Sequence, residues 1–335
     1  MTASPALVTS HPAAASVCSA GELRRMMRES ACDAARLERL RLDRILHRDS
    51  ARALVEVQAG TSWRALGEFL ADSVPALARG AAYGLLPGSV GEAVAANLPA
   101  PDGRPLVASV EAVTLVTPDG ELQRASRLRN AELFALAVGG QDLFGLTYSV
   151  TLRVDALAQA ARLAQSRAAQ RPHEGAESAG LAATLLVPPE ALENFLVAAR
   201  KLCEEWRAPI VQTEVLHTQS ENETRLRWAK RDYAAVTLGL ALPSPLGACV
   251  RGVQTWRALI DCAIGAGGSF PIARTRAATR TQIETCYPEL RAVFAEKACR
   301  DPGERLYNAW YKHHRRVLEA PAVSVRWNLA QAASA

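Results

Sequence analysis

Apolar and polar residues in the first half of the chain alternate in short runs that are separated by helical stretches. The run 54–60 alternates and ends in glycine, which predicts a strand and a turn. Strands are predicted at 54–60, 110–117, 122–125 and 146–154, and helices at 21–30, 61–70 and 130–137. Ser19 and Glu22 have capping-box spacing, and Thr61 is the expected N-cap of the second helix. The turn around Asp119-Gly120 should close a β-hairpin.

The second half has a different order of elements. Strands are predicted at 181–187, 210–217, 233–241 and 269–272, and helices at 189–206 and 250–266. This β-α-β-β-α-β order is the ferredoxin-like pattern. We therefore expect an α+β chain with these parts: a disordered tail at 1–18, a first domain at 19–155, a linker or surface crossing at 156–180, a second domain at 181–278 and a helical segment at 279–335.

Composition narrows the class of protein. With 335 residues, 49% apolar and 22% charged, the chain can bury a substantial core and is neither collagenous nor wholly disordered. No apolar run approaches the length of a membrane span, so we expect no membrane-spanning helix. The net charge of +5 comes from scattered arginines rather than a basic stripe, so no nucleic-acid partner is expected. Seven scattered cysteines without a CxxC motif indicate a cytoplasmic protein, and no metal site is expected.

Two glycine-rich segments are the candidates for binding a ligand. Pro87-Gly88-Ser89-Val90-Gly91 could cradle a phosphate through its backbone N–H groups, but taken alone it is better explained by a turn between two elements. Residues 138–145 contain three glycines and could contact a ligand closely or could simply cap a helix. The chain has no Walker motif, no GxGxxG and no GxSxG.

In combination, these segments resemble the flavin-binding domain of the FAD-linked oxidases of the vanillyl-alcohol oxidase and p-cresol methylhydroxylase (PCMH) type. The matching features are the strand ending in Ala59-Gly60, the glycine turn at 87–91, the hairpin with Asp119-Gly120, the N-x-E-L-F run at 130–134, and the glycine segment with the strand after it. RAATRTQIETCYPEL and DPGERLYNAWYKHH are similar to the end of bacterial FAD/FMN-containing dehydrogenases of this superfamily. The resemblance covers residues 45–154 most specifically and extends to about residue 314.

The resemblance implies a truncated PCMH-type FAD-binding domain followed by a ferredoxin-like α/β cap that covers the flavin ring. FAD would be bound non-covalently. By resemblance, the residues that hold its pyrophosphate are Pro87, Gly88, Ser89, Val90, Gly91 and Asn97, and those along its adenosine and ribityl side are Gly139, Gly140, Gly145 and Leu146. The catalytic candidates by position near the ring are Arg276, Tyr311 and His313.

The chain also departs from the family pattern. The family's first phosphate loop should precede Leu46, yet residues 30–42 contain no glycine. Glu92 stands where relatives have a second glycine, and its carboxylate would repel a pyrophosphate. The segment Ile272–Arg276 lacks the Tyr and His that relatives place near the flavin.

Two functions follow from these observations. One is an FAD-dependent oxidoreductase that moves a hydride from a small organic substrate to the flavin. The other is a non-catalytic flavin-domain remnant that acts as a binding or assembly protein, with a second copy or another protein as its partner.

Overall fold

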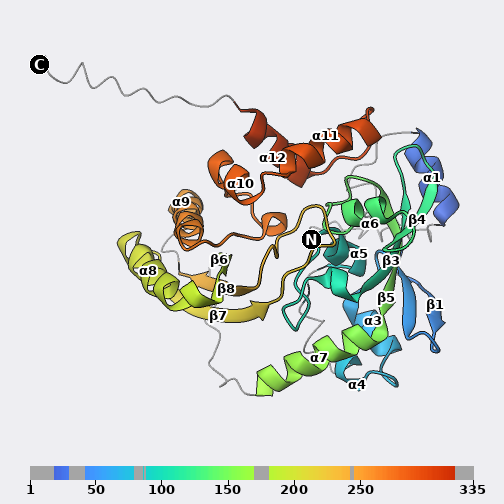
Figure 1. The fold of residues 1–335 in the computed structure, drawn as a ribbon, viewed down its shortest axis with the longest axis horizontal. Coiled ribbons are helices and arrows are strands. Elements are labelled where there is room, and N and C mark those ends of the chain that lie inside the picture. The colour runs from blue at the N-terminus through green and yellow to red at the C-terminus, as the bar shows by residue number, and fades with distance from the viewer. Residues whose placement is uncertain are drawn as a thin grey trace, which may run out of the picture.

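The computed structural model describes residues 19–29, 42–78, 86, 88–169, 181–241 and 245–320. Its N-terminal domain is built on a five-stranded antiparallel sheet in the order β1-β2-β5-β3-β4 (Figure 1). The strands are β1 (Ile45–Asp49), β2 (Leu54–Gln58), β3 (Val110–Val116), β4 (Leu122–Ser126) and β5 (Leu146–Arg153). Alternation places Val55, Val57 and Val113 in the core, as the pattern predicts. The edge strand β1 was not predicted.

Six α-helices and one 3-10 turn surround this sheet in the described part of the domain. They are α1 (Ala20–Glu29), α3 (Trp63–Phe69), α4 (Pro75–Ala78), α5 (Val90–Ala95), η1 (Leu106–Ser109), α6 (Ala131–Ala137) and α7 (Val154–Ala169). The predicted N-cap of α3 was wrong by one residue. Ser62 accepts the N–H of Ala65 at 3.1 Å, whereas the Thr61 hydroxyl faces the Arg44 carbonyl.

Helix α7 corrects the predicted linker at 156–180, because its described part is helical as far as Ala169. Leu157, Ala160 and Ala161 are fully buried, at helical spacing, and α7 packs against α4 and η1. The alanine-rich composition suggested a linker, but small residues suit the buried face of a closely packed helix. Residues 170–180 lie outside the described residues, and so does the tail predicted at 1–18.

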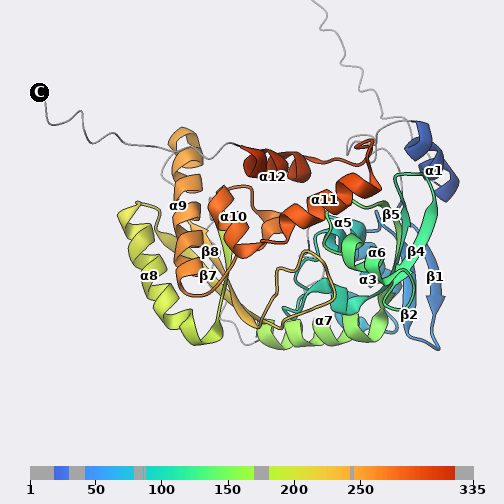
Figure 2. The same cartoon turned by 45° about the horizontal axis from the view of Figure 1, so that its top comes forward.

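The second domain is a three-stranded antiparallel sheet with two helices on one face (Figure 2). Its elements are β6 (Leu181–Val187), η2 (Pro189–Ala191), α8 (Leu192–Glu205), β7 (Ile210–Thr218), β8 (Tyr233–Leu240), α9 (Pro245–Gly265) and η3 (Ile272–Arg274), with the strand order β6-β8-β7. The strand predicted at 269–272 is reduced to one bridge between Ser269 and Leu186, beside β6. Pro271 has no N–H to extend it. With that bridge as its fourth strand, the domain is the expected ferredoxin-like α/β cap.

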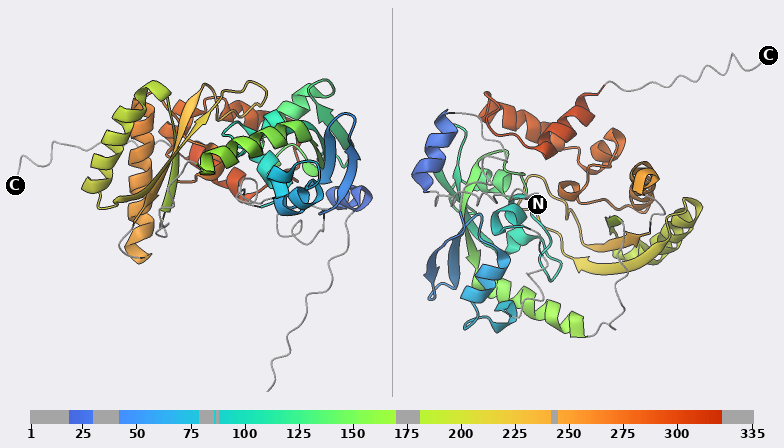
Figure 3. Two further views of the ribbon diagram at one scale, coloured as in Figure 1. Left: turned by 90° about the horizontal axis from the view of Figure 1, so that it is seen from below. Right: turned by 180° about the vertical axis from the view of Figure 1, so that it is seen from behind.

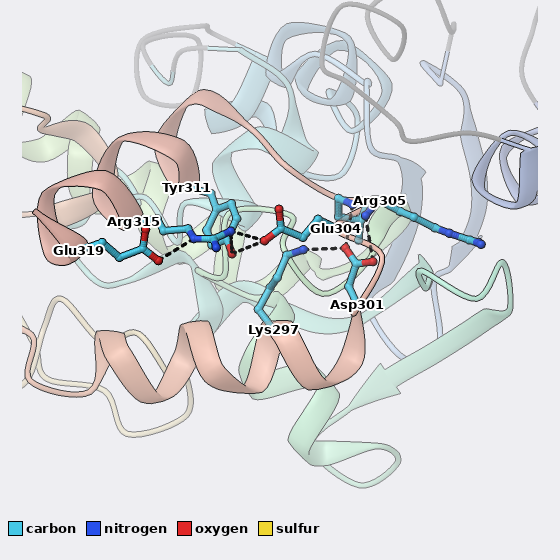
Figure 4. A network of polar contacts seen from close by, with 8 residues as sticks. Lys297, Asp301, Glu304, Arg305, Tyr311, Arg315 and Glu319 are labelled. Atoms are coloured by element: carbon cyan, nitrogen blue, oxygen red, sulfur yellow. Dashed lines mark hydrogen bonds and ion pairs between the residues drawn. The ribbon is translucent and has the colours of Figure 1, made fainter.

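The last three helices return from the cap to the N-terminal domain (Figures 1 and 3). They are α10 (Arg280–Cys286), α11 (Leu290–Arg300) and α12 (Ala309–Glu319). Between α11 and α12 the buried Lys297 binds Asp301 at 2.7 Å, and Asp301 accepts the N–H of Arg305 (Figure 4). The Arg305 side chain reaches the carbonyls of Met27 and Pro118, at 3.2 and 3.0 Å.

No described helix combines the length and the apolar character that crossing a membrane requires.

Candidate functional site

The glycine loop at 88–91 is held against the turn that follows β2. Val90 donates its N–H to the Thr61 carbonyl at 2.9 Å, and Gly91 donates to the Ala59 carbonyl at 2.7 Å. A Cβ at Gly91 would lie 2.6 Å from the Ala59 Cβ, so only glycine permits this approach. Gly88 is left-handed, with φ of +75°. The loop therefore has a specific close-packed backbone shape. Pro87, predicted as part of it, lies outside the described residues.

Ser89 and Glu92 form a reciprocal capping box at the start of α5. Ser89 donates its N–H to Glu92 Oε2 at 3.1 Å, and Glu92 donates its N–H to Ser89 Oγ at 3.3 Å. A Cβ added at Gly88 would overlap the Glu92 carboxylate, so that carboxylate lies directly over the loop. The N–H groups of residues 89–92 are thus all used within the chain: two bind backbone carbonyls and two bind side chains.

A second carboxylate, Asp142, lies close enough for its charge to interact with that of Glu92. Burial is the main cause that raises the pKa of Asp142 to about 6, and the Glu92 charge acts in the same direction. Thr147 donates to Asp142 Oδ1 at 3.0 Å. Gln141 and Asp142 are both left-handed, with φ of 57° and 55°. Sequence reasoning missed Asp142, although an acidic residue inside a glycine-rich connection was the available signal.

The other predicted cofactor glycines have packing roles. Gly139 is left-handed and donates its N–H to the Val94 carbonyl at 3.0 Å, near the end of α5. A Cβ at Gly140 would overlap the Leu136 carbonyl, and a Cβ at Gly145 would lie 3.0 Å from the Leu115 Cβ. Leu146 begins β5 and is buried in a small second core with residues of α1. Gly139 thus holds the connection against α5, whereas Gly140 packs against α6, Gly145 against β3 and Leu146 against the second core. Their contact with adenosine or ribityl atoms stays a prediction.

Asn97 follows α5 and joins the two domains. Its Oδ1 accepts the Val107 N–H at 2.9 Å, and its backbone carbonyl accepts the indole N–H of Trp228 at 2.6 Å. The side chain is fully buried, yet its Nδ2 has no hydrogen-bond partner. A buried amide donor without a partner is costly, which marks this position as one where a ligand acceptor could bind.

A cavity of about 150 Å³, here called the interdomain cavity, lies between the end of α5 and the inner face of the cap sheet. Its lining residues are Ala96, Asn97, Leu98, Pro99, Thr184, Leu186, Glu214, Leu216, Trp228, Ala235, Thr237, Pro271, Ala273 and Arg274. The wall is mostly apolar. Its polar side chains include the Thr184 and Thr237 hydroxyls, 3.1 Å apart, and the charged groups of Glu214 and Arg274. This cavity is smaller than common ligand pockets, which measure roughly 300–1,000 Å³, so it has room for a molecule of few atoms only.

The predicted catalytic residues lie elsewhere. The Tyr311 hydroxyl contacts Glu304 and Arg315, each at 3.5 Å, in a network between α11 and α12 (Figure 4). His313 Nε2 is buried without a partner, and burial together with the charges of Arg316 and Arg276 lowers the pKa of His313. The described lining of the interdomain cavity includes none of Arg276, Tyr311 and His313. Their catalytic role therefore stays a prediction without a geometric basis.

The residues around α5 fit an FAD molecule with one obstacle. The close-packed glycine loop and the unpartnered Asn97 amide suit a bound cofactor. The pyrophosphate, however, can reach the Ser89 N–H only if the Glu92 carboxylate leaves it. Because Glu92 is an exposed side chain, this movement needs no change of the backbone. The described residues thus accommodate FAD only after Glu92 is displaced.

Comparison with known families agrees with the sequence resemblance. Residues 22–126 match the family model described as an FAD binding domain. No curated protein matches the chain. The matched residues include the glycine loop, Glu92 and Asn97, together with four of the five strands of the N-terminal sheet. Residues 22–126, and with them most of the N-terminal sheet, therefore match an FAD binding domain, and FAD is the cofactor that this match supports.

Proposed function

We propose that this protein is an FAD-dependent oxidoreductase that oxidises a small organic substrate in the interdomain cavity, with FAD bound non-covalently. One observation carries the proposal: a single short helix, α5, has the glycine loop at its start and the cavity at its end. Its six residues span about 9 Å. A cofactor whose phosphates lie at the loop therefore runs alongside α5 towards the cavity.

The chain's own residues would bind and orient the reactants. Ser89 would donate its N–H to the pyrophosphate once Glu92 has left, and Asn97 would offer its free amide. When bound, FAD supplies the hydride acceptor, and the protein supplies position and surroundings. The apolar wall, including Leu186 and Leu216, would exclude water from the substrate.

Two charged residues, Glu214 and Arg274, line the cavity and are the candidates for acting on the substrate. Arg274 is the candidate for orienting an anionic or polar group of the substrate, and Glu214 is the candidate for accepting a proton from it. The ring-side candidates taken from the resemblance, Arg276, Tyr311 and His313, are not among the residues that line this cavity, whereas Glu214 and Arg274 are. The cavity size favours a substrate of few atoms.

A second candidate function is a non-catalytic binding or assembly protein. The observation that favours it is the Glu92 carboxylate at the loop where a dianionic pyrophosphate should bind, together with Asp142, whose charge interacts with that of Glu92. If FAD cannot displace Glu92, the fold would serve only as a scaffold for a partner.

Flavin content separates the two candidates. We expect the purified full-length protein, as isolated or after addition of FAD and gel filtration, to show absorbance bands near about 370 and 450 nm. Anaerobic addition of small alcohols, hydroxy acids and amines should then bleach the longer-wavelength band with at least one compound. A colourless protein that takes up no FAD would overturn the oxidoreductase proposal and leave the second candidate.

A cavity-filling variant tests where the substrate binds. Leu216→Trp should keep the flavin spectrum and abolish bleaching by the substrate, because the added indole fills the interdomain cavity. Leu128→Trp is the matched control, since Leu128 is 98% exposed, and it should behave like the wild type. Bleaching that survives in Leu216→Trp would place the substrate elsewhere.

A further inference from the structure

We infer that Glu92 is an internal competitor of FAD: its carboxylate occupies the position over Gly88 that a pyrophosphate oxygen needs, and thereby limits the affinity for FAD. The inference rests on the proposed function in one respect, because it takes FAD as the ligand. It goes beyond that proposal by naming the residue that sets how tightly the cofactor binds.

The pattern of hydrogen bonds leaves few donors for a phosphate. Val90 and Gly91 give their N–H groups to backbone carbonyls, and these bonds hold the loop in shape. Among residues 89–92, the N–H groups of Ser89 and Glu92 are the two that side chains bind, so these two can change partner without moving the backbone bonds of the loop. Since Glu92 Oε2 accepts the Ser89 N–H at 3.1 Å, a phosphate oxygen must replace that carboxylate.

Charge adds to this direct competition. Asp142 lies close enough to Glu92 for the two charges to interact, and both side chains carry negative charge when ionised. A pyrophosphate bound in place of the Glu92 carboxylate would therefore also be repelled by Asp142 when that residue is ionised. Displacing Glu92 into solvent relieves part of this repulsion, but Asp142 is held by Thr147 and stays.

Other helices of the same chain show that the negative charge is not needed for capping. Helix α10 has a complete capping box in which Gln282, an amide, takes the role of Glu92 and binds the N–H of Thr279 at 2.9 Å. Helix α1 has the same serine and glutamate pair, with the Ser19 N–H 2.6 Å from Glu22 Oε2. A glutamine at position 92 should therefore preserve α5.

The test measures the affinity of the full-length protein for FAD and for riboflavin, which lacks the phosphates. Flavin fluorescence or calorimetry gives Kd for the wild type, Glu92→Gln, Glu92→Ala and the control Glu22→Gln, with folding checked by circular dichroism. We expect Kd for FAD to fall about tenfold in Glu92→Gln, which removes the charge, and further in Glu92→Ala, which also empties the position. Riboflavin binding should be unchanged, and Glu22→Gln should match the wild type.

Each outcome decides the inference. An unchanged Kd for FAD in both Glu92 variants overturns it, and so does an equal gain for riboflavin, since the effect would not involve the phosphates. If the wild type binds FAD and the variants bind it no better, the oxidoreductase proposal stands and the competitor role fails. If only the variants bind FAD, the competitor role is supported and the oxidoreductase proposal fails for the natural chain. If no protein binds either flavin, both fail.

Discussion

The indole N–H of Trp228, in the loop between β7 and β8, donates to the backbone carbonyl of Asn97 at 2.6 Å and so joins the cap to the end of α5. Trp228→Phe removes this donor but keeps an aromatic ring, so we expect the free energy of unfolding to fall by about 1–3 kcal/mol. Chemical denaturation measures the change. Trp206→Phe, at a 38% exposed tryptophan that follows the last residue of α8, is the control and should change the free energy of unfolding by less than about 0.5 kcal/mol. Equal losses would contradict the role of the hydrogen bond.

A methyl group at Gly91 should disrupt the glycine loop. In Gly91→Ala the new Cβ would lie 2.6 Å from the Ala59 Cβ and 2.8 Å from the Ala59 carbonyl oxygen, so the loop or the turn after β2 must move. We expect a loss of at least about 2 kcal/mol in the free energy of unfolding. Gly265→Ala is the matched control, because no atom lies within 4 Å of its Cβ position. Thermal denaturation that shows equal stability for both variants would refute the close approach.

Neutralising Asp142 should stabilise the protein. Burial raises the pKa of Asp142 to about 6, so the folded state favours the protonated carboxyl group. The free energy of unfolding therefore decreases as the pH rises through about 6 and this group ionises in the folded chain. Asp142→Asn keeps an acceptor for Thr147 and tolerates the left-handed backbone. We expect a gain of about 1–3 kcal/mol at pH 7 that vanishes below about pH 4. Denaturation curves at several pH values test this.

Asp119 provides a control, because its pKa is shifted in the opposite direction to that of Asp142. The Thr117 hydroxyl, as the main cause, lowers the pKa of Asp119, so its ionised form is favoured in the folded state. Asp119→Asn should therefore lower the stability at pH 7. A gain of stability in both variants would mean that removing any negative charge helps, independently of burial.

The free energy of unfolding should decrease as the pH falls from about 6.5 to about 4, because His314 stays neutral in the folded chain. Burial lowers the pKa of this histidine to about 4, although its Nδ1 contacts the Trp310 carbonyl at 2.9 Å. In this window the unfolded chain takes up the proton and the folded chain does not, which costs on the order of 3 kcal/mol at the acid end. His314→Phe should flatten this slope of stability against pH. An unchanged slope in His314→Phe would contradict this role of His314.

The buried ion pair between α11 and the following turn should be sensitive to the loss of one partner. Lys297 is fully buried, and Lys297→Met leaves Asp301 charged in the interior, at a cost of about 3–5 kcal/mol. The double variant Lys297→Met/Asp301→Asn should recover part of this loss. Arg300→Met breaks partly exposed pairs only and should cost less than about 1 kcal/mol. Calorimetry of the three variants is the measurement.

The local pattern of apolar and polar residues was sufficient to predict the regular strands of the fold. β3 and β4 agree with the prediction because β-branched alternation and the Asp119-Gly120 turn specify a hairpin without help from distant residues. Helix α7 was missed because its composition gave no sign of the surfaces of α4 and η1 that bury it. The prediction of a full fourth cap strand at 269–272 was wrong for a local reason: Pro271 has no N–H to donate to the sheet, and the hydrophobic pattern alone does not show this.

For the candidate site, the sequence indicated the glycine loop and the conflict at Glu92, since both follow from neighbouring residues. The hydrogen bond between Trp228 and Asn97 and the meeting of Glu214 with Arg274 at one cavity were not predictable. These residues lie far apart in the chain, and only the packing of the cap on the N-terminal domain brings them together.

The hydrogen bonds of Arg305 have a consequence for synthesis on the ribosome. This side chain binds the carbonyls of Met27 and Pro118, which lie 278 and 187 positions earlier, and Leu306 completes the small core that buries Leu23 of α1. The N-terminal domain therefore leaves the ribosome with an apolar surface that stays uncovered until almost the whole described chain has been translated. During that interval Leu23 and Met27 of α1 lack the Leu306 side chain that helps to bury them in the finished fold.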